Sequence, residues 1–99
     1  MKKNFSDNEL AYIIDQSLIL QCACPAQVSK LILEIRELYN YQINCANDTS
    51  NEEQVHMNIA SASETSHIKL EACLLEILKI EKWDMKTLKM PNYLKNQKL

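Results

Sequence analysis

The cysteines are the residues of this chain whose chemistry could define a function. Cys22 and Cys24 are separated by one residue, and Cys73 lies far away in the sequence. Thiolates bind zinc and other soft metal ions, and neighbouring thiols can cycle between the reduced form and a disulfide. Cys22, Cys24 and Cys73 are therefore candidate metal ligands and candidate redox residues. The alternative is that Cys73 is a small core residue and the other cysteines are incidental.

The expected positions of these cysteines follow from the helices around them. Proline is well suited to the first position of a helix, so Pro25 should open a helix and Cys24 should be its N-cap. At that position the helix dipole lowers the pKa of a thiol. A hairpin loop centred near residue 48 places Cys24 level with Cys73, and it places Cys45 at the opposite end as a bystander. Cys22 or Cys73 could then resolve an oxidised Cys24.

Other kinds of chemistry have little support in this sequence. The chain has no glycine, which excludes glycine-rich phosphate loops, the dinucleotide fingerprint and the nucleophile elbow. His56 and His67 are eleven residues apart, roughly 16 Å along a helix, and cannot share a metal ion. Glu64 and His67 are expected on solvent-facing sides of their helix. We predict no catalytic residue, no enzyme activity and no cofactor, with zinc or another thiophilic metal at the cysteines as the alternative.

The spacing of apolar residues predicts an all-α fold, namely a small three-to-four-helix bundle built on a long antiparallel helix hairpin. Residues 1–99 form one domain. Ser6 and Glu9 have the spacing of a capping box, flanked by Phe5 and Leu10 as a hydrophobic staple, and they begin a helix over about residues 7–20. Further helices are expected over residues 25–45, over 51–83 with a break near 61–66 as the alternative, and over 85–90. Residues 92–99 should form a loose tail.

The third helix has an apolar seam in alternating steps of four and three residues, which is typical of antiparallel bundles. The seam consists of Val55, Ile59, Ala62, Ser66, Leu70, Cys73, Ile77 and Ile80. It should face the second helix, and it places Cys73 inside the hairpin. Because glycine caps are excluded, the helices should end through asparagine, proline or side-chain packing.

The end of this helix is apolar on nearly all sides, which indicates burial by several neighbours or by a partner. The candidate interface residues are Leu74, Leu75, Leu78, Trp83, Met90 and Tyr93. From them we predict a small non-enzymatic protein that acts through protein–protein interaction or self-association. The alternative function is thiol-based metal binding or redox sensing at Cys22, Cys24 and Cys73.

Charge and hydropathy narrow the choice of partners. Residues 4–78 hold eleven acids against three bases, a net charge of −8, and residues 79–99 hold six lysines against two acids, a net charge of +4. The chain has a single arginine, so a nucleic-acid partner is not expected. No apolar run reaches the roughly 18 residues that a membrane span needs. Asp7, Glu9 and Asp15 are unsuited to an export signal, so we expect a cytoplasmic protein with reduced thiols.

Overall fold

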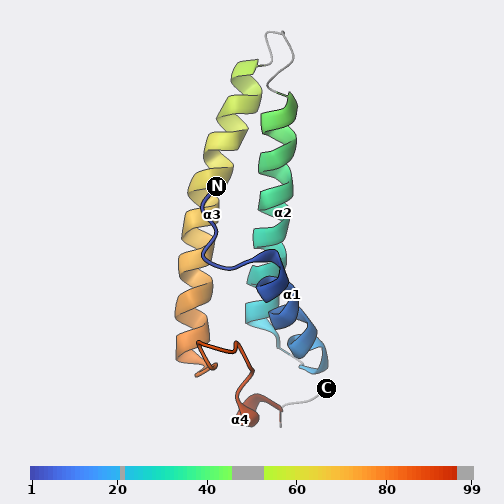
Figure 1. Cartoon of the computed structure of the whole chain (residues 1–99), viewed down its shortest axis with the longest axis vertical. Helices are drawn as coiled ribbons and strands as arrows, with labels where there is room; N and C mark the ends of the chain where they lie inside the picture. Colours follow the sequence, from blue (N-terminus) through green and yellow to red (C-terminus); the bar gives the residue numbers. More distant parts are fainter. Residues whose placement is uncertain (21, 46–52, 96–99) are drawn as a thin grey trace.

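The computed structural model describes residues 1–20, 22–45 and 53–95 (Figure 1). Its elements are α1 (Asp7–Gln16), the short 3-10 helix η1 (Ser17–Ile19), α2 (Cys24–Cys45), α3 (Glu53–Ile80) and α4 (Asn92–Lys95). The helices α2 and α3 form an antiparallel hairpin along the longest axis of a molecule that measures 54 × 23 × 18 Å. The predicted all-α fold on a long hairpin is confirmed. None of the described helices has the length and apolar character that crossing a bilayer requires.

The first helix begins at the predicted capping box. The Ser6 hydroxyl accepts a hydrogen bond from the Glu9 backbone N–H (3.0 Å), and the Glu9 carboxylate accepts one from the Ser6 N–H (2.8 Å). Phe5 and Leu10 are both buried in the hydrophobic core. The helix ends earlier than expected, at Gln16, and the 3-10 turn η1 follows.

The third helix is continuous through the serine-rich stretch at residues 61–66. The Ser63 hydroxyl donates a hydrogen bond to the Ile59 carbonyl (2.8 Å), and the Thr65 hydroxyl donates one to the Ser61 carbonyl (3.2 Å). Each hydroxyl bonds to the carbonyl one turn earlier, a pattern that helices tolerate. The alternative of a break is therefore excluded for Glu53–Ile80, while the expected start at residue 51 lies outside the described residues.

The buried face of α3 differs from the predicted seam. It consists of Ala60, Ser63, His67, Glu71, Leu74 and Leu78. In contrast, Cys73 is exposed, and Ile80 is 67% exposed. Leu70 and Ile77 of the predicted seam are partly buried against the core, so the buried face is offset from the seam by less than the 100° of one residue. This offset places Glu71 on the buried side, where its carboxylate accepts two backbone N–H groups of the N-terminal segment. Apolar periodicity cannot recognise a buried face that contains charged residues.

The segment after α3 corrects the predicted helix over residues 85–90. Residues 85–87 form a turn, and the Asp84 carboxylate accepts hydrogen bonds from the backbone N–H groups of Lys86 (2.8 Å) and Thr87 (2.9 Å). Asp84 therefore caps a single turn, which ends at Leu88 with a positive φ of 59°. The short helix α4 forms later, at Asn92–Lys95, within the predicted loose tail.

The end of α3 uses the cap that normally requires glycine. Lys82 has a φ of 64°, and its N–H bonds to the Lys79 carbonyl at 3.1 Å, while the Trp83 N–H bonds to the Leu78 carbonyl at 2.9 Å. These two bonds define a Schellman motif with Lys82 at the left-handed position. The expectation that helix ends would avoid this cap is wrong for α3.

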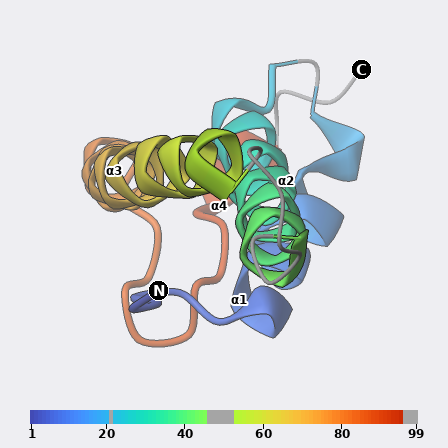
Figure 2. The ribbon, with the colours of Figure 1, turned by 90° about the horizontal axis from the view of Figure 1, so that it is seen from above.

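The C-terminal segment, which follows α3, covers the hydrophobic core at the end of the hairpin opposite the α2–α3 connection. Trp83, Leu88, Met90 and Leu94 are buried together with residues of α1, α2 and α3. The Gln16 side chain holds this segment to α1: its Nε2 donates to the Leu88 carbonyl (2.6 Å), and its Oε1 accepts from the Met90 N–H (2.7 Å). The N-terminal segment and the connection from α3 to α4 both lie on one side of the α2–α3 hairpin (Figure 2).

Candidate functional site

Of the three candidate cysteines, the structure brings two together. The Sγ atoms of Cys22 and Cys24 are 3.6 Å apart, and both residues are exposed. Cys73 is exposed on α3. Within the described ranges, no group of three or more histidine, cysteine, aspartate or glutamate side chains could hold a metal ion. The predicted convergence of Cys22, Cys24 and Cys73 is therefore not found.

The orientation of α3 accounts for the separate position of Cys73. Near the loop, Gln42 Oε1 lies 2.7 Å from His56 Nδ1, as a loop centred near residue 48 predicts. At the other end of the hairpin, however, Cys73 is exposed on α3 and is not part of its buried face. The count of residues from the loop gives the level of Cys73 along the helix but not the side to which it points.

The thiol of Cys24 also differs electrostatically from the prediction. Its pKa is raised, first because of the hydrogen bond with Cys22 and then because of the charge of Cys22 and partial desolvation. This direction is opposite to the lowering expected from the helix dipole. Cys45, the predicted bystander, is half-buried at the other end of α2.

The predicted interface residues divide into two groups. Those buried in the core of the chain are Leu74, Leu78, Trp83 and Met90. Leu75 and Tyr93 are 38% and 47% exposed, and the Tyr93 hydroxyl donates a hydrogen bond to the Glu81 carbonyl (2.8 Å). The apolar end of α3 is thus covered largely by the C-terminal segment of the same chain.

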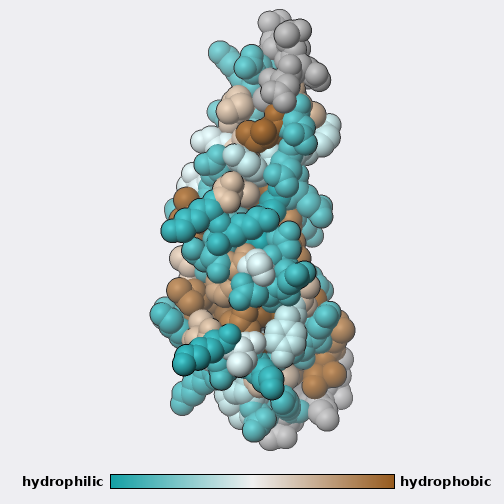
Figure 3. Space-filling view, viewed as in Figure 1, coloured by the Kyte–Doolittle hydropathy of each residue, from teal (hydrophilic) through white to brown (hydrophobic). Residues whose placement is uncertain are grey.

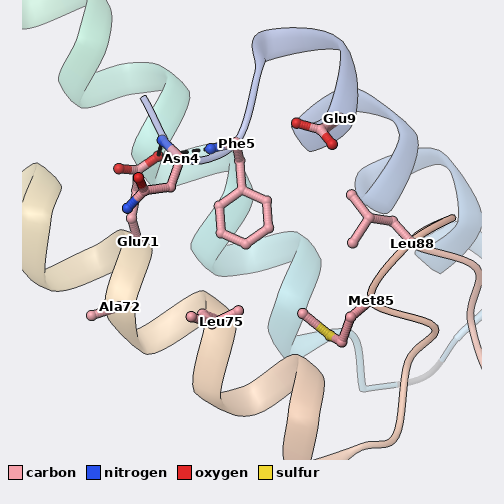
Figure 4. A pocket seen from close by; sticks show the side chains of 8 residues that line it. All are labelled: Asn4, Phe5, Glu9, Glu71, Ala72, Leu75, Met85 and Leu88. Carbon is pink, nitrogen blue, oxygen red and sulfur yellow. Dashed lines mark hydrogen bonds between the residues drawn. The ribbon is translucent and has the colours of Figure 1, made fainter. Parts of the chain in front are cut away.

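Leu75 lines a pocket of about 320 Å³ between the N-terminal segment, α3 and the turn after α3. Figure 4 shows the side chains of Phe5, Leu75, Met85 and Leu88 around this space. Glu71 also lines the pocket, but its carboxylate bonds to backbone N–H groups of the N-terminal segment. The pocket therefore offers an apolar wall rather than a reactive group.

A buried cluster of charged side chains in the middle of the hairpin was not predicted. Arg36, His67 and Glu71 are 4%, 1% and 2% exposed. Arg36 Nε donates to His67 Nε2 (2.9 Å), and Arg36 Nη2 donates to Glu71 Oε2 (3.0 Å). Arg36 Nη1 donates to the carboxylate of Asp7 in α1. We call the three buried residues Arg36, His67 and Glu71, together with the exposed Asp7, the Arg36 cluster.

The Arg36 cluster anchors the N-terminal segment across the hairpin. Glu71 Oε2 accepts hydrogen bonds from the backbone N–H groups of Asn4 (2.9 Å) and Phe5 (3.1 Å). Arg36 Nη2 donates to the Phe5 carbonyl (2.6 Å). The single arginine of the chain thus connects α1, α2, α3 and the N-terminal segment. Because its polar groups are engaged with one another, the cluster acts as a structural tie.

Two titratable groups of the cluster have shifted pKa values. Burial lowers the pKa of His67, and the charge of Arg36 adds to this effect against that of Glu71. Since Nε2 accepts from Arg36, Nδ1 carries the proton of the neutral ring, and it lies 3.6 Å from Glu71 Oε1. The hydrogen bond from Arg36 lowers the pKa of Asp7. The sequence expectation that His67 faces solvent is wrong.

The remaining candidate is an apolar groove on the α2–α3 hairpin. It has a volume of about 260 Å³, and no residue of α1 or of the N-terminal segment lines it. We call the surface around it the open face and define it by Ile35, Leu38, Val55, Ile59, Ala62 and Ser66; the polar residues Gln54, Asn58 and Ser63 also line this surface. Leu38 is 43% exposed, and Val55 is 55% exposed. Leu31, one turn before Ile35, is 44% exposed.

The open face is distinct from the side of the hairpin that the N-terminal segment crosses. Met1 and Lys2 line a pocket with Glu64, His67 and Ile68, on another side of α3. Figure 3 shows the side with the N-terminal segment covered mainly by hydrophilic residues, with hydrophobic ones in the gaps. Four of the six open-face residues, all in α3, belong to the seam that the sequence analysis had placed inside the hairpin.

Comparison with known proteins gives no further guide to the site. No family model matches the chain, and neither a curated protein nor a solved structure matches it.

Proposed function

We propose that this protein acts through helix–helix association, and that its open face binds a second copy of the chain. The observation that carries the proposal is that α3 has a mainly apolar stripe in addition to its buried face. The buried face, which includes His67 and Glu71, packs against the rest of the chain. The additional stripe repeats in steps of four and three residues through Val55, Ile59, Ala62 and Ser66, the spacing of helices that pack in bundles, and it lies on the open face.

The size of this face is that of a small interface. From Val55 to Ser66 the open face is about 17 Å long, and two adjacent helices are about 20 Å wide. The product is about 340 Å² per partner, below the ~800 Å² of a standard interface, so we expect a weak dimer. A two-fold axis would bring the same residues of both copies together.

The small residues of the open face also favour close packing. Along α3 the larger Val55 and Ile59 are followed by the smaller Ala62 and Ser66, and the last three line the groove together with Leu38 of α2. Small residues allow helices to approach closely, while larger ones interdigitate. Two hairpins that face each other in this way form a four-helix bundle.

The experiment that tests this proposal is a measurement of mass in solution by sedimentation equilibrium. One chain has a mass of 11.5 kDa, so the dimer should appear at about 23 kDa. Ala62→Glu should shift the protein to the monomer, because it places a charge in the centre of the apolar face. Ala62 is exposed in the single chain, so the substitution should leave its fold intact.

The matched control is Ser61→Glu. Ser61 is the exposed neighbour of Ala62 on α3, about 100° around the helix, and it does not line the groove. This variant should remain dimeric. The proposal would be overturned if the wild-type chain stayed monomeric at about 0.1 mM, a concentration that populates a dimer with a Kd of that order. It would also be overturned if both variants dimerised equally.

A further inference from the structure

We propose that Cys22 and Cys24 form a two-sulfur chelate for a soft monovalent metal ion, namely copper(I). The two Sγ atoms are 3.6 Å apart, and both residues are exposed, so an ion can reach them from solvent. The two thiols approach each other across a single intervening residue, Ala23. This site does not depend on the self-association proposed above.

The distance between the sulfur atoms suits a shared metal ion. A thiolate sulfur lies about 2.3 Å from a bound zinc ion, and a comparable length for copper(I) separates two sulfur ligands by about 3.8 Å in tetrahedral geometry and about 4.6 Å in linear geometry. The present separation of 3.6 Å is about 0.2 Å shorter than the first distance and about 1 Å shorter than the second. The pair as it stands therefore suits a bent arrangement of the two sulfur atoms around the ion, and a linear one would require them to move apart.

The number of ligands selects the kind of metal. Structural zinc sites need four ligands, and no group of three or more candidate ligands gathers among the described residues. Soft thiolates favour copper(I), an ion that is stable with two sulfur ligands. Binding forms two Cu–S bonds, releases the two thiol protons to solvent and leaves the oxidation state of copper and sulfur unchanged.

The start of α2 favours the charge of the resulting complex. Two thiolates and one copper(I) ion carry a net charge of −1. Cys24 is the first residue of α2, a helix of 22 residues. The positive end of the helix dipole stabilises a negative group at this position, while the charge of Glu81, which also acts on Cys24, opposes it.

The test is a competition for copper(I) between the reduced protein and a chromophoric copper(I) chelator under anaerobic conditions. Wild-type protein should bind one copper(I) per chain. Cys22→Ser and Cys24→Ser should each weaken binding at least tenfold, because one sulfur ligand is lost. Cys73→Ser, which removes another exposed thiol of the chain, should bind like the wild type.

Three results would overturn the proposal. These are the absence of competition by the wild-type protein, unchanged binding by Cys22→Ser and Cys24→Ser, and a loss of binding by Cys73→Ser equal to theirs. A parallel competition with a zinc indicator tests the choice of metal, and tighter binding of zinc than of copper(I) would reject it. Circular dichroism of each variant should match that of the wild type, since all three cysteines are exposed.

Discussion

Arg36 Nε donates a hydrogen bond of 2.9 Å to Nε2 of His67, and both side chains are buried. An arginine remains charged throughout the physiological range. Its donor therefore requires a lone pair on Nε2, which a protonated imidazole does not have. The pair thus fixes His67 as a neutral ring with its proton on Nδ1. Because the Arg36 cluster holds the N-terminal segment on the hairpin, the stability of this attachment depends on pH.

The first prediction concerns this dependence on pH. The pKa of His67 in the folded protein is lowered from 6.5, mainly by burial. In the unfolded chain His67 has its ordinary pKa, so below about pH 6.5 the unfolded state binds more protons than the folded state. The free energy of unfolding should therefore be highest above pH 6.5 and should fall as the pH decreases from there toward the folded pKa.

Urea denaturation between pH 5 and pH 7.5 measures this effect. The control is His67→Gln, because the amide oxygen can accept the bond from Arg36 without titrating. The difference between the two proteins isolates His67 from other groups. If the wild type and His67→Gln lose stability in parallel as the pH falls, the neutral buried histidine is not the cause.

The second prediction concerns Arg36 itself. Arg36→Met should lower the free energy of unfolding by about 3–5 kcal/mol, because it leaves the buried carboxylate of Glu71 without its cationic partner. Chemical denaturation at pH 7 provides the value. Lys30→Met, at an exposed position of the same helix, should change stability by less than about 0.5 kcal/mol. Equal effects of the two substitutions would contradict the structural role of the Arg36 cluster.

The parts of the fold that the sequence predicts are those set by local interactions. Ser6 and Glu9 form their capping box within four residues, so residue type and spacing are sufficient to identify it. The Arg36 cluster differs, because Arg36 and Glu71 are 35 residues apart. Two features of the sequence indicate a buried ion pair. One is a lone arginine in an acidic segment, and the other is the spacing of His67 and Glu71 by one helical turn. Apolar periodicity does not reveal either feature, because it involves only apolar residues.

The candidate sites were likewise predictable where they depend on neighbouring residues, and not where they depend on distant contacts. The proximity of Cys22 and Cys24 follows from their spacing in the sequence, whereas the place of Cys73 depended on the orientation of α3. The buried side of α3 includes Glu71, on which the N-terminal segment packs through backbone groups. Backbone contacts leave no trace in residue types. The periodic seam was identified correctly as a stripe, but the structure assigns part of it to the open face.

The third prediction concerns the bond between α1 and the C-terminal segment. Gln16→Ala removes both hydrogen bonds to the backbone of Leu88 and Met90. These backbone groups are partly buried, so the loss should cost about 1–3 kcal/mol. Hydrogen exchange at the Met90 amide should accelerate in this variant. Exchange at Ile13, in the core of α1, should change less, and an unchanged rate at Met90 would show that Gln16 does not hold the segment.

The fourth prediction concerns the cap of α3 in a chain that has no glycine. Lys82 has a φ of 64°, a conformation that costs a residue with a Cβ about 1 kcal/mol relative to glycine. Lys82→Gly should therefore raise the free energy of unfolding by about 1 kcal/mol. Lys79→Gly, three residues earlier within the helix, should lower it by about 1 kcal/mol, because glycine is unfavourable inside a helix. Thermal denaturation of both variants gives the comparison. Opposite signs support the left-handed cap, and destabilisation by both would contradict it.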